Sequence, residues 1–170
     1  MSKKLWVIRP EPNFINRMKD FLENEMVAIG WPAVGDLGGG LTRQQLAERL
    51  CDTYEHYLKE QKSDLAVAAG ILDRFVNQVK IGDLFLVPDA GNVYIGEVTG
   101  DYTFHPELNS DSPEAGYPHW RKVKYFKDGK PFTTIKSLPL GVRRAIDCRL
   151  TVFSIHSAAS AMWNFFHNHE

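Results

Sequence analysis

The fold is decided by residues 79–102, VKIGDLFLVPDAGNVYIGEVTGDY. Residues 83–88 are a short apolar run, typical of a buried strand, and residues 93–100 are a second run rich in β-branched and aromatic side chains. Between them stands Asp-Ala-Gly-Asn at residues 89–92, a combination that favours a turn. The segment therefore predicts two antiparallel strands joined as a β-hairpin.

Further strands are expected on both sides of this hairpin. Residues 5–8 and 26–29 are short β-branched or aromatic runs, and residues 150–155 predict a last strand. Residues 119–126 alternate basic with apolar or aromatic side chains. Since successive side chains of a strand point to opposite faces, this strand should have one wet, basic side.

Apolar residues at helical spacing predict helices at residues 14–22, 42–58, 63–79 and about 157–167. Thr42 followed by Gln45 has the pattern of a capping box, and Asn13 is a candidate cap for the first helix. About six strands and four helices indicate an α+β fold, which we expect to be a small curved mixed β-barrel with helices packed on its outside. The length of 170 residues fits a single domain, 1–170.

The charges of the chain are segregated, although its net charge is only −1. Residues 83–114 contain seven acids and no Lys or Arg, whereas residues 121–149 contain nine bases and two acids. Either the two segments pair with each other, or the basic one forms a face for phosphates.

Several enzyme classes and locations are not indicated by this sequence. It contains no GxxxxGK[ST], GxGxxG or GxSxG motif. Cys51 and Cys148 lack the spacing of metal ligands, so we expect reduced thiols, no cofactor and a cytoplasmic location. The first residues, MSKKLWVIRP, contain no long apolar run, which argues against a signal peptide or a membrane partner.

Four stretches together carry a resemblance to a known family. They are WVIR (6–9), VAIGWP (27–32), VKIGDLFLVP (79–88) continuing into YIGEVTGDY (94–102), and YPHWRKV (117–123). Over about residues 5–153 the chain resembles the EVE-like branch of the PUA fold, in particular the N-terminal modules of Mrr-type modification-dependent restriction proteins. The resemblance implies a curved barrel, an aromatic-lined pocket for a flipped base and a positive surface for the nucleic-acid backbone. Those proteins carry a nuclease domain after the module, and this chain ends at Glu170, so cleavage would need a separate nuclease subunit.

Two aromatic residues at glycine-marked strand ends are candidates for the walls of the base pocket. Trp31 follows Gly30, and Tyr102 follows Gly100 by two positions. Stacking of a base on an aromatic ring is worth ~1–3 kcal/mol, which is the physical case for this role. The alternative for Trp31 is a core position under the loop that follows it, predicted at residues 32–40 from its five glycines and prolines.

Four more residues complete the predicted base pocket: Arg9, Asp101, His119 and Trp6. Arg9 could donate to a base edge or form a structural salt bridge, and Asp101 could accept an exocyclic amino proton or bond local backbone in a turn. His119 either faces the pocket or bonds structurally at the start of a strand. Trp6 lies within the first strand, where a large aromatic is typical of the core.

Arg121, Lys122 and Lys124 are the predicted phosphate-binding residues, and strand alternation places Arg121 on the face opposite the two lysines. The leading hypothesis is a nucleic-acid-binding module without catalysis of its own, which reads a modified, methylated base, in DNA rather than RNA. One alternative is a metal-dependent nuclease built on Asp83, Glu97 and Asp101. The other is a protein-interaction adaptor on the same fold.

Two further motifs could indicate metal chemistry, and both have simpler explanations. Glu60-Gln61-Lys62 has the ExK spacing of many nucleases but falls on an expected helix, where charged residues are the norm. The C-terminal residues 167–170, HNHE, resemble a metal cluster but are typical of a frayed tail.

Overall fold

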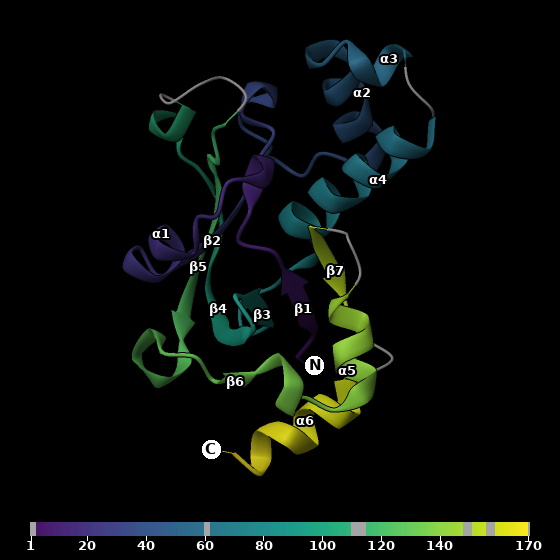
Figure 1. Cartoon of the computed structure of the whole chain (residues 1–170). Coiled ribbons are helices and arrows are strands. Elements are labelled where there is room, and N and C mark those ends of the chain that lie inside the picture. The colour runs from purple at the N-terminus through teal and green to yellow at the C-terminus, as the bar shows by residue number, and fades with distance from the viewer. Residues whose placement is uncertain (1–2, 60–61, 110–114, 148–150, 156–158, 170) are drawn as a thin grey trace.

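The structure is a computed structural model that describes residues 3–59, 62–109, 115–147, 151–155 and 159–169. Within these residues the strands form one mixed sheet in the order β2-β5-β4-β3-β1-β7, with β6 paired to β4 (Figure 1). Only the β1–β3 pair is parallel among the paired strands described. The strands are β1 (Leu5–Ile8), β2 (Met26–Ile29), β3 (Leu84–Asp89), β4 (Asn92–Phe104), β5 (His119–Tyr125), β6 (Thr133–Thr134) and β7 (Val152–Ser154).

Two groups of helices lie at opposite ends of the molecule, α2–α4 at one end and α5 with α6 at the other, while α1 lies apart from both beside β2 (Figure 1). The α-helices are α1 (Met18–Glu23), α2 (Arg43–Thr53), α3 (His56–Lys59), α4 (Lys62–Asp73), α5 (Leu140–Ile146) and α6 (Ala159–His167). A π-helical turn, Arg74–Gln78, directly follows α4. Short 3₁₀ turns occupy Pro12–Phe14, Pro32–Val34, Pro106–Asn109, Phe126–Gly129 and Ile135–Ser137.

The predicted hairpin and its turn are confirmed. Strands β3 and β4 pair as far as Asp89 with Asn92, so the connection is the two residues Ala90 and Gly91. Both have positive φ, 47° and 81°, as a type I′ turn requires. The turn matches the twist of the strands, which fixes the register of the central pair.

The strands β1 and β3 are buried on both faces, which explains their continuous apolar sequences. Trp6 and Phe85 belong to a core shared with α1, α2 and α4, whereas Val7 and Leu86 belong to a second core beneath α5 and α6. The sheet is therefore sandwiched between helices at its centre. Among the described residues, no helix is both long enough and apolar enough to cross a membrane.

The α+β class is confirmed, but the predicted barrel does not form, because the sheet is not closed. Strands β2 and β7 are its two ends, and within the part of the chain that the structure describes each pairs with one neighbour. The turn after α4 joins the two sides instead. Arg74 donates from Nη1 to the Val152 carbonyl of β7 at 3.1 Å, and Arg121 of β5 donates to the Phe75 and Val76 carbonyls.

The helix ends follow the sequence in one case and depart from it in another. The capping box of α2 is confirmed, since the Thr42 hydroxyl accepts from the Gln45 N–H and the Gln45 side chain accepts from the Thr42 N–H. Asn13 does not cap α1, which begins after Arg17. Its side chain donates to the Gly116 carbonyl at 2.9 Å, so it holds a loop in place.

Candidate functional site

An irregularity in β4 sets the geometry of the candidate site. Val98 pairs with Val123, but Tyr102 is already opposite Arg121, so residues 99–101 bulge from the ladder beside Lys122. A β-bulge bends its strand and changes the direction of side chains. Asp101, within the bulge, and Tyr102, directly after it, both line a cavity.

The cavity has a volume of about 200 Å³, and we call it the Tyr102 cavity. Its lining comes from three segments. These are the loop residues Gly38, Gly39 and Gly40, the π-helical turn after α4 with the residues that follow it (Val76, Asn77, Val79 and Lys80), and the sheet residues Asp101, Tyr102 and Arg121. Three residues predicted for binding, Asp101, Tyr102 and Arg121, therefore share one cavity.

The glycine loop, Gly38–Gly40, lines the cavity in a conformation that glycine allows. Gly39 and Gly40 have φ of +89° and +76°, in the region that residues with a Cβ rarely adopt. A Cβ at Gly38 would lie 3.9 Å from the Tyr102 ring. The preceding Leu37 is fully buried and anchors the loop to the core.

Hydrogen bonds hold the Tyr102 ring against the cavity. Its hydroxyl accepts from the Leu37 N–H at 3.0 Å and lies 2.7 Å from His119 Nδ1. The other ring nitrogen of His119, Nε2, is 3.1 Å from the Trp31 carbonyl, which can only accept. Nε2 therefore carries the proton, and Nδ1 accepts from Tyr102.

The protonation states of this network are set by burial. His119 is fully buried, and burial lowers its pKa to about 4, against a smaller opposing effect of the hydrogen bond to Trp31. Burial also raises the pKa of the Tyr102 hydroxyl. At neutral pH both groups are uncharged, so Tyr102 remains a donor to His119 and its ring is fixed before any ligand arrives.

Arg121 is a buried cation at the wall of the Tyr102 cavity. Its side chain donates to the Phe75 carbonyl at 2.7 Å, the Val76 carbonyl at 2.8 Å and, at 3.4 Å, the Gly100 carbonyl. The Phe75 and Val76 carbonyls lie in the last helical turn, where a helix leaves its carbonyls without helical partners. Burial lowers the pKa of Arg121, and the charge of Asp101 acts in the opposite direction.

The guanidinium retains binding capacity after these contacts. A guanidinium has five N–H groups, and three hydrogen bonds to described residues leave one N–H on each terminal nitrogen without a described acceptor. Asp101 is exposed at the same cavity and supplies an acceptor. The site thus combines a flat ring, fixed donors and a carboxylate.

The sequence did not identify Asn77, Lys80 or the three glycines as site residues. Asn77 and Lys80 fall at the end of a predicted helix, and the glycines were assigned only to a loop. Asn77 uses both amide N–H groups, on the Leu41 carbonyl and on Asp73, so its side-chain oxygen is left as an acceptor. The run of three glycines was the available signal.

The remaining predicted pocket residues lie elsewhere or behind the cavity wall. Trp31 is partly buried, and its indole N–H donates to the Tyr57 hydroxyl at 2.9 Å. His119 is in the core and positions Tyr102 rather than facing a ligand. Trp6 is a core residue whose indole N–H donates to Asp83, and Arg9 donates to the Ile146 carbonyl of α5.

The predicted phosphate-binding residues divide as strand alternation requires. Arg121 is 2% exposed, so it is no part of an exposed basic face. Lys122 and Lys124 are exposed on the other face of the sheet. Among the described residues, no ion pair joins the acidic segment 83–114 to the basic segment 121–149.

The three carboxylates of the nuclease alternative have different surroundings. Asp83 is buried and accepts from the Lys4 and Lys80 N–H groups and from Trp6. Glu97 pairs with Lys3 at 3.0 Å. No group of three or more His, Cys, Asp or Glu side chains within the described ranges is placed to hold a metal ion. Cys148, Glu170 and most of the ExK motif (Glu60 and Gln61) lie outside the described residues.

The chain was compared with known families, curated proteins and solved structures. No curated protein and no solved structure matches it. One family model, described as a domain of unknown function (DUF8426), matches residues 6–145. Since this match covers well over half of the chain, the protein belongs to the DUF8426 family.

Proposed function

We propose that this domain binds nucleic acid, DNA rather than RNA, and holds one modified, methylated base in the Tyr102 cavity without catalysing a reaction. The observation that carries the proposal is the meeting of a fixed tyrosine ring, a buried guanidinium with unused N–H groups and an exposed carboxylate. Cleavage of the bound strand would then be the task of a separate nuclease subunit.

The size of the cavity supports a small ligand. Pockets for drug-sized molecules span ~300–1,000 Å³. The Tyr102 cavity of about 200 Å³ is smaller, which suits a ligand of roughly one base rather than a larger cofactor. An extruded base presents both a flat face and an edge, and the cavity has a partner for each.

The edge of a base carries both donors and acceptors, which is the pattern that this lining complements. Arg121 can donate to a ring nitrogen or carbonyl, and Asp101 can accept from an exocyclic amino group. Extruding a base costs a few kcal/mol, and stacking on Tyr102 returns ~1–3 kcal/mol of this. The hydrogen bonds to the edge and the contacts of a methyl group must supply the rest.

A panel of short DNA and RNA strands, each with one methylated or hydroxymethylated base, tests the proposal by fluorescence anisotropy. We expect one modified strand to bind more tightly than its unmodified copy. Tyr102→Leu should weaken that binding by about tenfold to a hundredfold, the equivalent of one lost stack. Asp101→Asn, at an exposed position, should reduce the preference without affecting folding.

Trp120→Ala is the matched control. Trp120 is an aromatic residue of β5 on the face opposite Arg121, where it stacks on His105 at 4.1 Å between ring centroids. Its removal should leave the preference unchanged. Equal binding of all strands by the unaltered protein, or a preference that depends on Trp120 and not on Asp101, would refute the proposal.

A further inference from the structure

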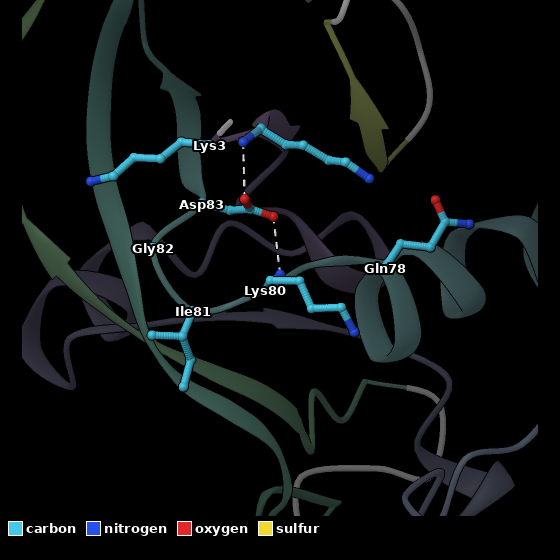
Figure 2. A pocket seen from close by; sticks show the side chains of 7 residues that line it. Lys3, Gln78, Lys80, Ile81, Gly82 and Asp83 are labelled. Atoms are coloured by element: carbon cyan, nitrogen blue, oxygen red, sulfur yellow. Dashed lines mark hydrogen bonds between the residues drawn. The ribbon is translucent and has the colours of Figure 1, made fainter. Parts of the chain in front are cut away.

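A second cavity, of about 550 Å³, adjoins the candidate site and is bordered by three lysines. We call it the lysine cavity; Lys3, Lys4, Lys80, Gln78 and Asp83 are among its lining residues. Figure 2 shows Gln78 and Lys80 lying to the same side of Asp83, while Lys3 extends toward β4. Lys3 is paired with Glu97 of β4 at 3.0 Å, but this pair is exposed and therefore weak, so its ammonium group can exchange to a phosphate. Together with Lys4 and Lys80 it gives the hollow an excess of positive charge.

Asp83, the one carboxylate among the described residues of this lining, is committed to the fold. Asp83 accepts from the Lys4 N–H at 2.9 Å, the Lys80 N–H at 3.0 Å and the Trp6 indole N–H at 2.9 Å (Figure 2). It is 5% exposed. Its acceptor sites are thus directed at the backbone and the core and not at the lysine side chains. Lys80 donates one of its three ammonium N–H groups to the Asn77 carbonyl at 2.7 Å, which leaves the others for an anion.

The lysine cavity and the Tyr102 cavity share Lys80. A strand whose base enters the Tyr102 cavity would bring its neighbouring phosphates within reach of this lysine and of the hollow behind it. Lys122 and Lys124, by contrast, are on the face of β5 opposite Arg121. To reach them from the Tyr102 cavity, a strand would have to pass around the sheet.

We propose that the lysine cavity binds the phosphodiester backbone of the strand whose base occupies the Tyr102 cavity. This inference rests on the proposed function, and it moves the phosphate contacts from Lys122 and Lys124 to Lys3, Lys4 and Lys80. Each ammonium group that neutralises a phosphate releases a counterion, so the contacts are measurable as a dependence of binding on salt.

The test uses a single strand of DNA built entirely from abasic sites, which has phosphates but no bases. Its binding to the whole chain is measured by fluorescence anisotropy across a salt series, for the unaltered protein and two double variants. In a plot of the logarithm of the binding constant against the logarithm of the salt concentration, Lys3→Gln/Lys4→Gln should reduce the magnitude of the slope by about 1.4. Each lost contact to a single strand contributes ~0.7. Lys122→Gln/Lys124→Gln removes the same charge from the other face and should leave the slope unchanged.

The outcomes separate this inference from the function on which it rests. A slope lowered only by Lys122→Gln/Lys124→Gln, equal effects of the two variants, or no binding of the abasic strand would each overturn the assignment of the lysine cavity. The proposed function fails by a different result, equal affinity of modified and unmodified strands that do carry bases. The abasic strand has no base and therefore tests only the phosphate contacts, whereas the strands with bases test the proposed function.

Discussion

Replacement of Arg121 by methionine is expected to destabilise the protein by about 3–5 kcal/mol. The guanidinium makes two short hydrogen bonds, to the carbonyls of Phe75 and Val76, which methionine cannot make. Each hydrogen bond from a charged donor is worth ~1.5–3 kcal/mol, and the carbonyls at this helix end would lose their partner. The melting temperature should fall by on the order of 10 °C, measured by circular dichroism.

Lys122→Met is the matched control, because it makes the same chemical change one residue further along β5. Lys122 is exposed, and exposed substitutions usually change stability by less than ~0.5 kcal/mol. If Arg121→Met melted at the same temperature as Lys122→Met, the claim that Arg121 joins the π-helical turn after α4 to the sheet would be wrong.

A second large effect is expected from the protonation of His119. The pKa of this residue is lowered by burial to about 4, from the 6.5 of an unperturbed histidine. At pH values between these two pKa values, the unfolded chain binds a proton at His119 and the folded protein does not. The free energy of unfolding therefore falls as the pH falls. The stabilisation is fully present above pH ~6.5, and about 2 kcal/mol of it is lost between pH 7 and pH 5.

Urea unfolding of the unaltered protein and of His119→Gln at pH 7 and pH 5 measures this effect. Glutamine does not titrate, so the variant should lose about 2 kcal/mol less than the unaltered protein over the same interval. The variant is expected to be less stable at pH 7, because the hydrogen bond from Tyr102 is altered. The test therefore compares the change in unfolding free energy between pH 7 and pH 5, not the stability at one pH. The same decline in both proteins would show that His119 is not the group that titrates.

Local sequence predicts the strands of the sheet apart from the two-residue β6, but its prediction that the sheet closes into a barrel is wrong. The hairpin at residues 83–100 was evident, because alternation, turn chemistry and apolar character agree there. Whether the sheet closes depends on how α4 and its π-helical turn pack between β5 and β7, a long-range contact through Arg74 and Arg121. The helix Leu140–Ile146 was missed because it is short and contains Gly141.

The candidate site was predictable only in part, for a related reason. Tyr102 and Asp101 are predicted from Gly100, which the sequence indicates as the end of a strand. That strand end is wrong, because β4 continues to Phe104 and Gly100 lies in its bulge. The sequence predicts that Arg121 contacts phosphates. In the structure its side chain lies on the buried face of β5, where it donates to helix carbonyls and not to solvent. Asn77 and Lys80 come from the end of a helical segment, and nothing near them in sequence indicates that a cavity lies there.

The location of the bound base is tested most directly by NMR. A ¹⁵N-labelled sample is titrated with the modified strand that binds most tightly in the panel. The account predicts that the amide signals of Gly38, Gly39 and Gly40 and the Arg121 Nε–H signal shift in proportion to occupancy, while the Trp120 indole signal stays in place. Shifts that gather at Trp120 while the three glycines remain unmoved would contradict the assignment of the Tyr102 cavity as the base-binding site.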